Sequence, residues 1–211
     1  WNIGDLSNWN TSKVTDMSSM FSDCSSLTTL DLSNFNTSNA TNMEEMFYQS
    51  YVEDLDISNF NTSKVTNMGG MFSHCRNLKN LNEIIKVLDT SSVTDMSYLF
   101  SSIPETATEL DLTHFNTEKV QNMESMFYWS QKLQKIDMTG CKTPALTDTY
   151  RMFNYCTSLK ELIIPDIDFS NVTDYSNMFD SVPKTCKIVT NQAAADWLAA
   201  HYSSYTNIEI V

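Results

Sequence analysis

One phrase of sequence recurs along almost the whole chain, and this recurrence limits the folds that the chain can adopt. The pair Met-Phe occurs six times, and Leu99-Phe100 fills the one gap in the series. The six pairs are Met20-Phe21, Met46-Phe47, Met71-Phe72, Met126-Phe127, Met152-Phe153 and Met178-Phe179. With Phe100 included, the phenylalanines follow one another at intervals of 25 to 28 residues. Seven copies of a unit of about 26 residues predict a solenoid in which each copy forms one coil.

Each unit contains two segments that differ in the spacing of their apolar residues. Leu27, Leu30 and Leu32 follow the spacing of a leucine-rich repeat, and alternation around Asp31 favours a short strand with one buried face. In residues 14–21 the apolar residues are three or four apart, which is typical of one helix face. We therefore predict an α/β solenoid, a right-handed leucine-rich-repeat array of seven coils. A parallel sheet would line one side and short helices the other.

Stacked coils would bury their apolar residues in columns that run along the solenoid. One such column is Leu30, Leu55, Leu110, Ile136 and Leu162. The 12 methionines recur at fixed coil positions and fill irregular gaps well, so we assign them to the core and not to metal or sulfur chemistry. A further column is formed by threonines, which we expect to close the turn before each helix through their hydroxyls. These are Thr11, Thr37, Thr62, Thr90, Thr117 and Thr143.

The repeat phrase stops near residue 189, which suggests a division of the chain into two parts. Residues 1–189 form the leucine-rich-repeat solenoid of about seven coils, each of 25–28 residues. Residues 190–211 contain strong helix formers after a polar start and then a short apolar run, which predicts a C-terminal capping helix and a short strand. The first unit opens at Asp5-Leu6 without a cap, so we expect the natural protein to continue upstream.

The charge of the chain restricts its partners. A formal net charge of −13 argues against nucleic acid and against anionic membrane, because phosphate binding requires a basic surface. No run approaches the ~20 apolar residues of a membrane span, so we expect no direct membrane insertion. The beginning, Trp1-Asn2-Ile3-Gly4, lacks the basic segment of a signal peptide.

The phrase N-T-S-x-V-T-[DN]-M-x-x-M-F, found at residues 10–21 and 61–72, resembles the 26-residue repeat of bacterial surface proteins. That repeat belongs to the BspA-like leucine-rich-repeat family, and the resemblance covers residues 5–189. It implies an extracellular location at the bacterial cell surface and a role in adhesion, with leader and anchor outside this chain. It implies no catalytic residues.

Large aromatic residues follow some of the Met-Phe pairs, at a turn where the repeat requires only small polar residues such as Ser22. Flat amphipathic rings at that turn could stack on sugars or anchor a protein interface. The alternative is that they cover gaps between coils. The candidate binding residues are Tyr48, Tyr128, Trp129 and Tyr155, with Trp129 as the leading one.

A second candidate is an acidic ladder on the outer face of the strands. It consists of Asp5, Asp31, Asp56, Asp111 and Asp137. Such a row could bind a basic partner or calcium, which prefers several oxygen ligands. The alternative is that each carboxylate binds local amides and hydroxyls, such as those of Ser33 and Ser58. Because no Asp-rich loop with metal spacing occurs, we assign no metal site.

The five cysteines lack zinc-binding spacing, and we expect free, buried thiols without a disulfide. Cys156 and Cys186, in neighbouring coils, are the one pair that remains open to pairing. The histidines at 74, 114 and 201 occupy unrelated coil positions, and the four glycines form no phosphate-binding run. We therefore expect no enzyme activity and no cofactor.

Two functions remain. A non-catalytic, adhesin-type binding module would contact a host or neighbouring-cell protein, mucin or glycan. A structural spacer of a larger surface protein would have no ligand of its own and would show uniform coils. This chain departs from its own repeat in coils four to six, at residues 82–87, at Tyr128-Trp129 and at residues 142–144, which favours the binding module.

Overall fold

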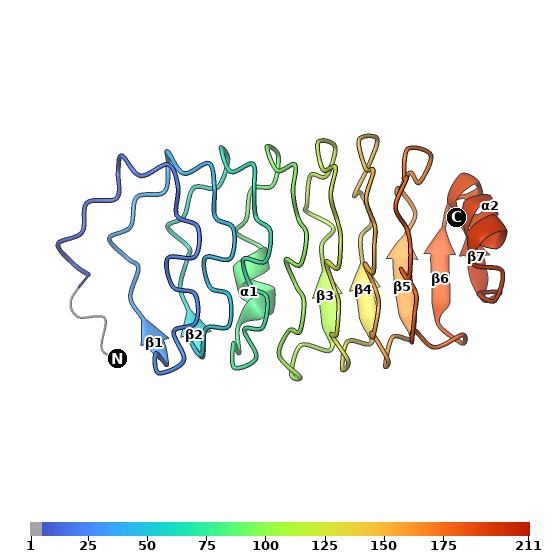
Figure 1. Ribbon diagram of the computed structural model, residues 1–211, viewed down its shortest axis with the longest axis horizontal. Coiled ribbons are helices and arrows are strands. Elements are labelled where there is room, and N and C mark those ends of the chain that lie inside the picture. Colours follow the sequence, from blue (N-terminus) through green and yellow to red (C-terminus); the bar gives the residue numbers. More distant parts are fainter. Residues whose placement is uncertain (1–5) are drawn as a thin grey trace.

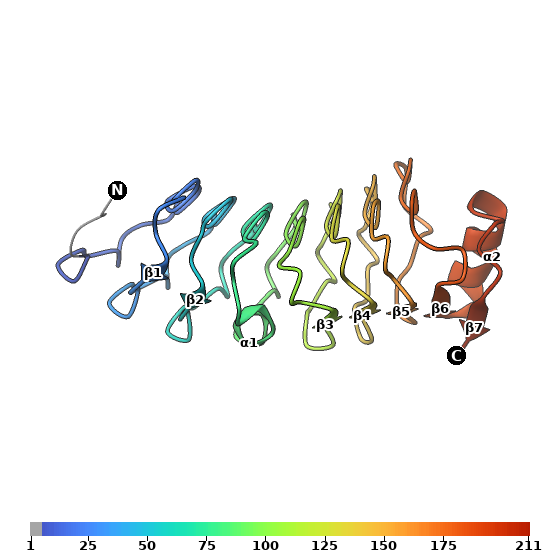
Figure 2. The ribbon, with the colours of Figure 1, turned by 90° about the horizontal axis from the view of Figure 1, so that it is seen from below.

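The chain winds into a parallel-sheet β-solenoid of about six turns with few helices, as the computed structural model shows for residues 6–211 (Figures 1 and 2). The coils lie side by side along the longest axis of the molecule, with the first coil at one end and helix α2 (Gln192–His201) at the other. The coils are numbered by the seven copies of the sequence repeat, and six successive bridges link them in order. The solenoid predicted from the repeat is therefore confirmed.

Short parallel strands line one side of the solenoid, as predicted. β1 (Thr29–Leu30) pairs with β2 (Asp54–Leu55). A second sheet has the order β3 (Glu109–Asp111), β4 (Lys135–Asp137), β5 (Glu161–Ile164), β6 (Lys187–Thr190) and β7 (Ile208–Ile210). The register places Leu30 beside Leu55, and Leu110 beside Ile136 and Leu162. This is the predicted apolar column.

Helix α1 (Leu81–Ile85) occupies the strand position of the fourth coil and separates the two sheets (Figure 1). Its residues Leu81, Ile84 and Ile85 are buried. The helix therefore keeps the apolar core continuous where the strand ladder is interrupted. It lies within the longest interval of the repeat, between Phe72 and Phe100.

The prediction of short helices on the opposite side is wrong. The Met-Phe segments instead form a second ladder between coils, which begins at the bridge of Asp16 with Asn42 and continues to that of Asp148 with Asp174. Within it, the backbone N–H groups of alternate residues donate to carbonyls of the next coil. Met17 N donates to Asn42 O at 2.9 Å, and Phe21 N to Met46 O at 2.9 Å.

Left-handed residues explain why these segments resembled helices. In each coil two residues four positions apart have positive φ, as Ser19 (φ 53°) and Asp23 (φ 55°) do in the first. Tight turns accompany them, because Ser22 N donates to the carbonyl of Ser19. In a chain that turns every four residues, buried apolar residues recur three or four residues apart. Apolar residues on one face of a helix have the same spacing.

A column of phenylalanine rings fills the core behind this second ladder. Neighbouring rings lie at centroid distances of 5.3 to 6.4 Å with small interplanar angles, and Phe47 and Phe72 stack at 5.8 Å. The column consists of Phe21, Phe47, Phe72, Phe100, Phe127, Phe153 and Phe179. All seven side chains are buried.

The threonine column links coils and does not close turns within a coil, which corrects the prediction. Thr37 Oγ1 donates to Asn61 O at 3.1 Å and accepts from Asn61 N at 2.7 Å. Thr11, Thr62, Thr90 and Thr143 make the same pair of bonds, and Thr117 donates to Lys142 O. These threonines are buried, so each hydroxyl satisfies backbone groups of the following coil.

Helix α2 lies against the last coil. The Asn191 side chain accepts a hydrogen bond from Ala194 N at 2.9 Å, which satisfies one free amide of the first turn. Trp197 stacks on Phe169 with a centroid distance of 4.6 Å, and Leu198 is buried. β7 then adds to the edge of the sheet beside β6.

The left-handed positions give a first prediction for stability. Glu45 has φ 53°, and the same coil position is occupied by Gly70 in the next coil. Glu45→Gly is expected to raise the free energy of unfolding by about 0.5–1 kcal/mol, because relief of the left-handed backbone exceeds the added entropy of the unfolded chain. Urea denaturation followed by circular dichroism measures this change.

The matched control is Glu44→Gly, since Glu44 is also exposed but does not have positive φ. This change should lower the free energy of unfolding by about 0.5–1 kcal/mol, because glycine adds chain entropy and removes the carboxylate that accepts from Asn67 Nδ2 at 3.2 Å. Equal losses in both variants would contradict a strained backbone at Glu45.

Candidate functional site

The turn after each Met-Phe pair directs one side chain away from the core. In the fifth coil this residue is Trp129, whose φ is 60° and whose N–H donates to Asn154 O at 2.9 Å. Ser130 N bonds back to Phe127 O at 3.2 Å and completes the turn. The backbone is thus fixed by the ladder while the indole, 39% exposed, projects from the surface.

Three of the four predicted aromatic residues lie together. The ring centroids of Trp129 and Tyr155 are 4.5 Å apart, those of Tyr128 and Trp129 5.9 Å, and those of Tyr128 and Tyr155 6.3 Å. Tyr155 is also 39% exposed, whereas Tyr128 is half-buried. We call Tyr128, Trp129 and Tyr155 the aromatic cluster.

Tyr48, the fourth predicted residue, lies outside this cluster. Its ring meets the imidazole of His74 edge-on, with a centroid distance of 5.6 Å. Tyr48 and Tyr128 instead share a shallow cavity of about 240 Å³ that runs from the second to the fifth coil. Gly70 and Tyr98 also line it.

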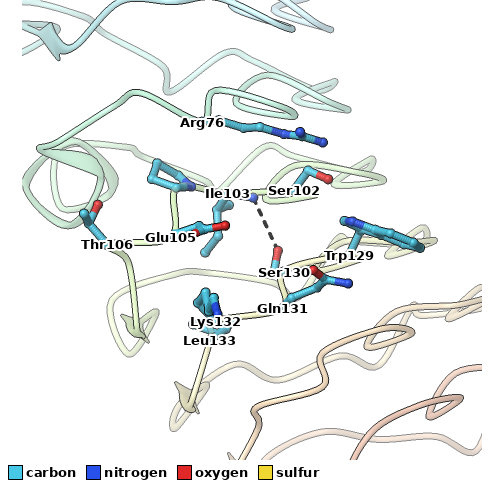
Figure 3. A pocket seen from close by; sticks show the side chains of 11 residues that line it. Arg76, Ser102, Ile103, Glu105, Thr106, Trp129, Ser130, Gln131, Lys132 and Leu133 are labelled. Carbon is cyan, nitrogen blue, oxygen red and sulfur yellow. Dashed lines mark hydrogen bonds between the residues drawn. The ribbon is translucent and has the colours of Figure 1, made fainter.

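A larger cavity of about 390 Å³ adjoins Trp129 (Figure 3). Three successive coils form its wall: Arg76 comes from the third, residues 102–106 from the fourth and residues 129–133 from the fifth. Ser130 Oγ supports the wall from below, because it donates to Phe100 O at 3.0 Å and accepts from Ile103 N at 3.5 Å. Both apolar and polar atoms face the space.

The polar groups of this cavity differ in hydrogen-bonding character. Arg76 and Lys132 donate, Glu105 accepts, and Gln131 can do both. Burial, and then the nearby Arg76 guanidinium, lower the pKa of His74, so its ring is neutral at pH 7. Sequence reasoning missed Arg76, Ser102, Glu105 and Lys132, because they occupy turns that carry no recurring signal.

The acidic ladder makes local bonds along the outer face of the strands. Asp31 Oδ1 accepts from Ser33 N at 2.9 Å, and Asp56 Oδ1 accepts from Ser58 N at 2.9 Å. Asp111 and Asp137 accept both the amide and the hydroxyl of Thr113 and Thr139. Asp5 lies outside the described residues.

These bonds lower the pKa of Asp31 and Asp56, first through the backbone amides of Ser33 and Ser58 and then through their hydroxyls. The carboxylates thus act as turn-forming groups, as the alternative interpretation predicted. Among residues 6–211, no group of three or more His, Cys, Asp and Glu side chains is arranged to hold a metal ion.

A different ladder of Asp and Asn side chains accompanies the isolated bridges. In each coil its Oδ1 atom accepts from the backbone amide two residues later. The members are Asp16, Asn42, Asn67, Asp95, Asn122, Asp148 and Asp174. Asn and Asp therefore perform the same structural task, and only Asp adds charge.

Burial raises the pKa of Asp148, and the Asp174 carboxylate of the next coil raises it further. Asp148→Asn is therefore expected to raise the free energy of unfolding at pH 7 by about 0.5 kcal/mol, the size of one like-charge cross-strand pair. An acid with a raised folded pKa destabilises the fold when it is charged. The gain should thus shrink as the pH falls through that pKa and vanish below about 3.8, the ordinary value.

Urea denaturation at pH 7 and at pH 3.5 measures this effect. Asp31→Asn serves as the control, because its carboxylate is stabilised in the folded state and its loss should not raise stability at either pH. A gain for Asp148→Asn that persists at pH 3.5 would contradict the electrostatic origin.

The five cysteines are free in the structure, and four of them are buried. Burial raises the pKa of the thiols of Cys75, Cys141, Cys156 and Cys186 to about 12. The Cys75 thiol donates to Phe47 O at 2.9 Å, and the Cys156 thiol donates to Phe127 O at 3.1 Å. These groups thus serve as packing residues with internal hydrogen bonds.

The histidines are separated along the solenoid. His114 Nε2 bonds to Ile85 O at 2.7 Å, and His201 Nδ1 bonds to Trp197 O at 2.8 Å. Neither contacts the cavity beside Trp129. Within the part of the chain that the structure describes, no helix is both long enough and apolar enough to cross a membrane.

Comparison with known proteins gives a family and no function. No curated protein and no solved structure matches the chain. One family model matches residues 1–81 and again residues 73–192, so that it covers nearly all of the repeat. The chain therefore belongs to the family described as "Mycoplasma protein of unknown function, DUF285".

Proposed function

We propose that this protein is a non-catalytic binding module that presents the aromatic cluster to a host or neighbouring-cell protein, mucin or glycan. One observation carries the proposal. The ring centroids of Tyr128, Trp129 and Tyr155 lie within 6.3 Å of one another, at a turn where the first, fourth and seventh coils place only Ser and Asp. Two of the three rings are 39% exposed.

The fold does not need these rings. Ser22, Ser73 and Ser101 occupy the position of Tyr128 in other coils, and the hydrogen-bond ladder continues through them. Adjacent exposed rings lower solubility unless a ligand covers them, so their presence supports a binding role over that of a spacer. Aromatic anchors in such clusters supply much of the affinity of an interface.

The proposal also includes the repeat group to which the solenoid belongs and its location. We assign the solenoid to the BspA-like leucine-rich-repeat group, with a right-handed array, α2 as its cap and a location outside the bacterial cell. The recurring phrase at residues 10–21 and 61–72 and the family membership support this assignment. Calcium, nucleic acid and enzyme activity have no part in it.

A binding screen of the full chain against a glycan array, immobilised mucin and host matrix proteins tests the proposed function. We expect at least one surface to retain the protein. Trp129→Ala should then weaken binding about thirtyfold, because anchors of this kind contribute ~2 kcal/mol or more. Circular dichroism and the melting midpoint should stay nearly unchanged, since the indole is exposed.

Trp9→Ala is the matched control, because Trp9 is 50% exposed and belongs to the first coil, away from the aromatic cluster. It should leave binding unchanged. The proposal fails if no surface retains the wild-type protein. It also fails if Trp129→Ala lowers stability by several degrees while affinity stays intact.

A further inference from the structure

The second residue after the recurring phenylalanine of each coil lies at the same position of the turn, and these residues form a column along the solenoid. In the fourth coil this residue is small, which leaves a gap in the column. The third, fifth and sixth coils place His74, Trp129 and Tyr155 there, whereas the fourth coil places Ser102. All four residues have positive φ between 50° and 61°, so the backbone directs them alike. One small side chain thus stands among three large rings.

The gap arises only from the small side chain, because the backbone hydrogen bonds between coils continue on both sides of it. His74 N donates to Ser101 O at 2.9 Å, and Ser102 N donates to Tyr128 O at 2.8 Å. The cavity of about 390 Å³ beside Trp129 opens where the ring is missing from the column. Figure 3 shows Arg76 and Trp129 extending in the same direction, with Ser102 between them.

The environment of Ser102 also indicates that a ligand binds here. Its side chain is 3% exposed, and its Oγ atom has no hydrogen-bond partner within residues 6–211. A buried hydroxyl without a partner destabilises the folded chain. The Ser101 hydroxyl next to it, by contrast, donates to Tyr128 O at 3.1 Å.

The groups around the gap define the chemistry that would fit. Trp129 offers a flat apolar face, Arg76 offers donors, and Glu105 offers an acceptor. An apolar ligand would leave these polar groups without partners, and a ligand with only acceptors would meet the Glu105 carboxylate. A ring that carries C–H groups on one face and hydroxyls at its edge satisfies all of them.

We propose that this gap binds one pyranose ring of a glycan, which rests on Trp129, receives hydrogen bonds from Arg76 and donates to Glu105. Ser102 Oγ forms the floor and pairs with a sugar hydroxyl. The inference rests on the proposed binding function and specifies its ligand. A volume of about 390 Å³ lies in the range of small-ligand sites, roughly 300–1,000 Å³, and suffices for a single sugar.

Titration calorimetry of the full chain with methyl β-D-glucopyranoside, methyl β-D-galactopyranoside and methyl α-D-mannopyranoside tests the inference. We expect at least one to bind with a Kd of about 1 mM, the affinity of a single shallow site. Ser102→Tyr inserts a ring like those of the neighbouring coils and should weaken that binding at least tenfold. Its circular dichroism spectrum should match that of the wild type.

Ser181→Tyr is the matched control, because Ser181 occupies the same position in the seventh coil with φ 65° and is exposed. It should leave pyranoside binding unchanged. Ser102→Ala removes only the hydroxyl and should produce a smaller loss than Ser102→Tyr. Equal binding by wild type and Ser102→Tyr would overturn the inference.

The outcomes separate the inference from the proposed function. If no pyranoside binds but a matrix protein binds in a manner sensitive to Trp129→Ala, the proposed function stands and the sugar site is wrong. If the wild-type protein binds no pyranoside and no array, mucin or matrix surface retains it, both proposals are rejected.

Discussion

Replacing Phe127 by alanine is expected to lower the free energy of unfolding by about 3–5 kcal/mol. Phe127 is 0% exposed and stacks between Phe100 at 6.1 Å and Phe153 at 5.5 Å. Its removal leaves a cavity that the neighbouring coils cannot fill, because their own backbones are held in place by the ladder on both sides. Urea denaturation followed by circular dichroism and fluorescence measures the loss.

Two further variants serve as controls for this prediction. Phe127→Leu retains most of the volume and should cause a clearly smaller loss. Tyr155→Ala removes a ring that is 39% exposed from the adjacent surface and should change stability by less than about 1 kcal/mol. A loss for Phe127→Ala no larger than that for Tyr155→Ala would show that the ring column does not hold the coils together.

Thr90→Val is expected to lower the free energy of unfolding by about 2–4 kcal/mol. Thr90 Oγ1 donates to Asn116 O at 2.9 Å and accepts from Asn116 N at 2.8 Å, and the side chain is 2% exposed. Valine has nearly the same shape but no hydroxyl, so an amide and a carbonyl of the next coil lose their partner together. The same denaturation experiment detects the change.

Thr90→Ser keeps the hydroxyl and should lose only the small contribution of a methyl group, about 1 kcal/mol. Thr94→Val is the second control. Thr94 Oγ1 donates to Thr66 O at 3.1 Å, but that carbonyl also accepts from Thr94 N and Asp95 N. A small effect at Thr94 with a large one at Thr90 would confirm that unsatisfied backbone groups cause the loss. Equal effects would contradict this cause.

The period of the repeat sufficed to predict the solenoid and its apolar columns. Residues at equal positions of successive coils must stack, which places Leu30 beside Leu55 and Phe47 on Phe72 without knowledge of the backbone. The backbone conformation between these stacked residues could not be predicted from the period of the repeat. A left-handed residue every four positions repeats the apolar spacing of a helix, so the Met-Phe segments were assigned to helices.

The candidate site was predictable only where it followed the repeat. Tyr128, Trp129 and Tyr155 stood out because they replace small residues at known coil positions, and the structure brings them together. Arg76 and Glu105 come from turns of other coils, and only the three-dimensional structure places them beside the same cavity as Trp129. Ser102 carries no signal in the sequence, because a serine at this position is what the repeat ordinarily permits.

The directions of the ladder bonds also bear on how the molecule responds to tension. Neighbouring coils are joined by hydrogen bonds that run along the long axis, and the first and last coils lie at opposite ends (Figures 1 and 2). A force applied between those ends loads every interface between coils in series, and a terminal coil, which has a neighbour on one side only, detaches first. Each coil then releases about 26 residues, roughly 80–90 Å of chain at ~3.4 Å per residue. A stretched molecule would therefore lengthen in discrete steps and limit the force that reaches a ligand held on its side.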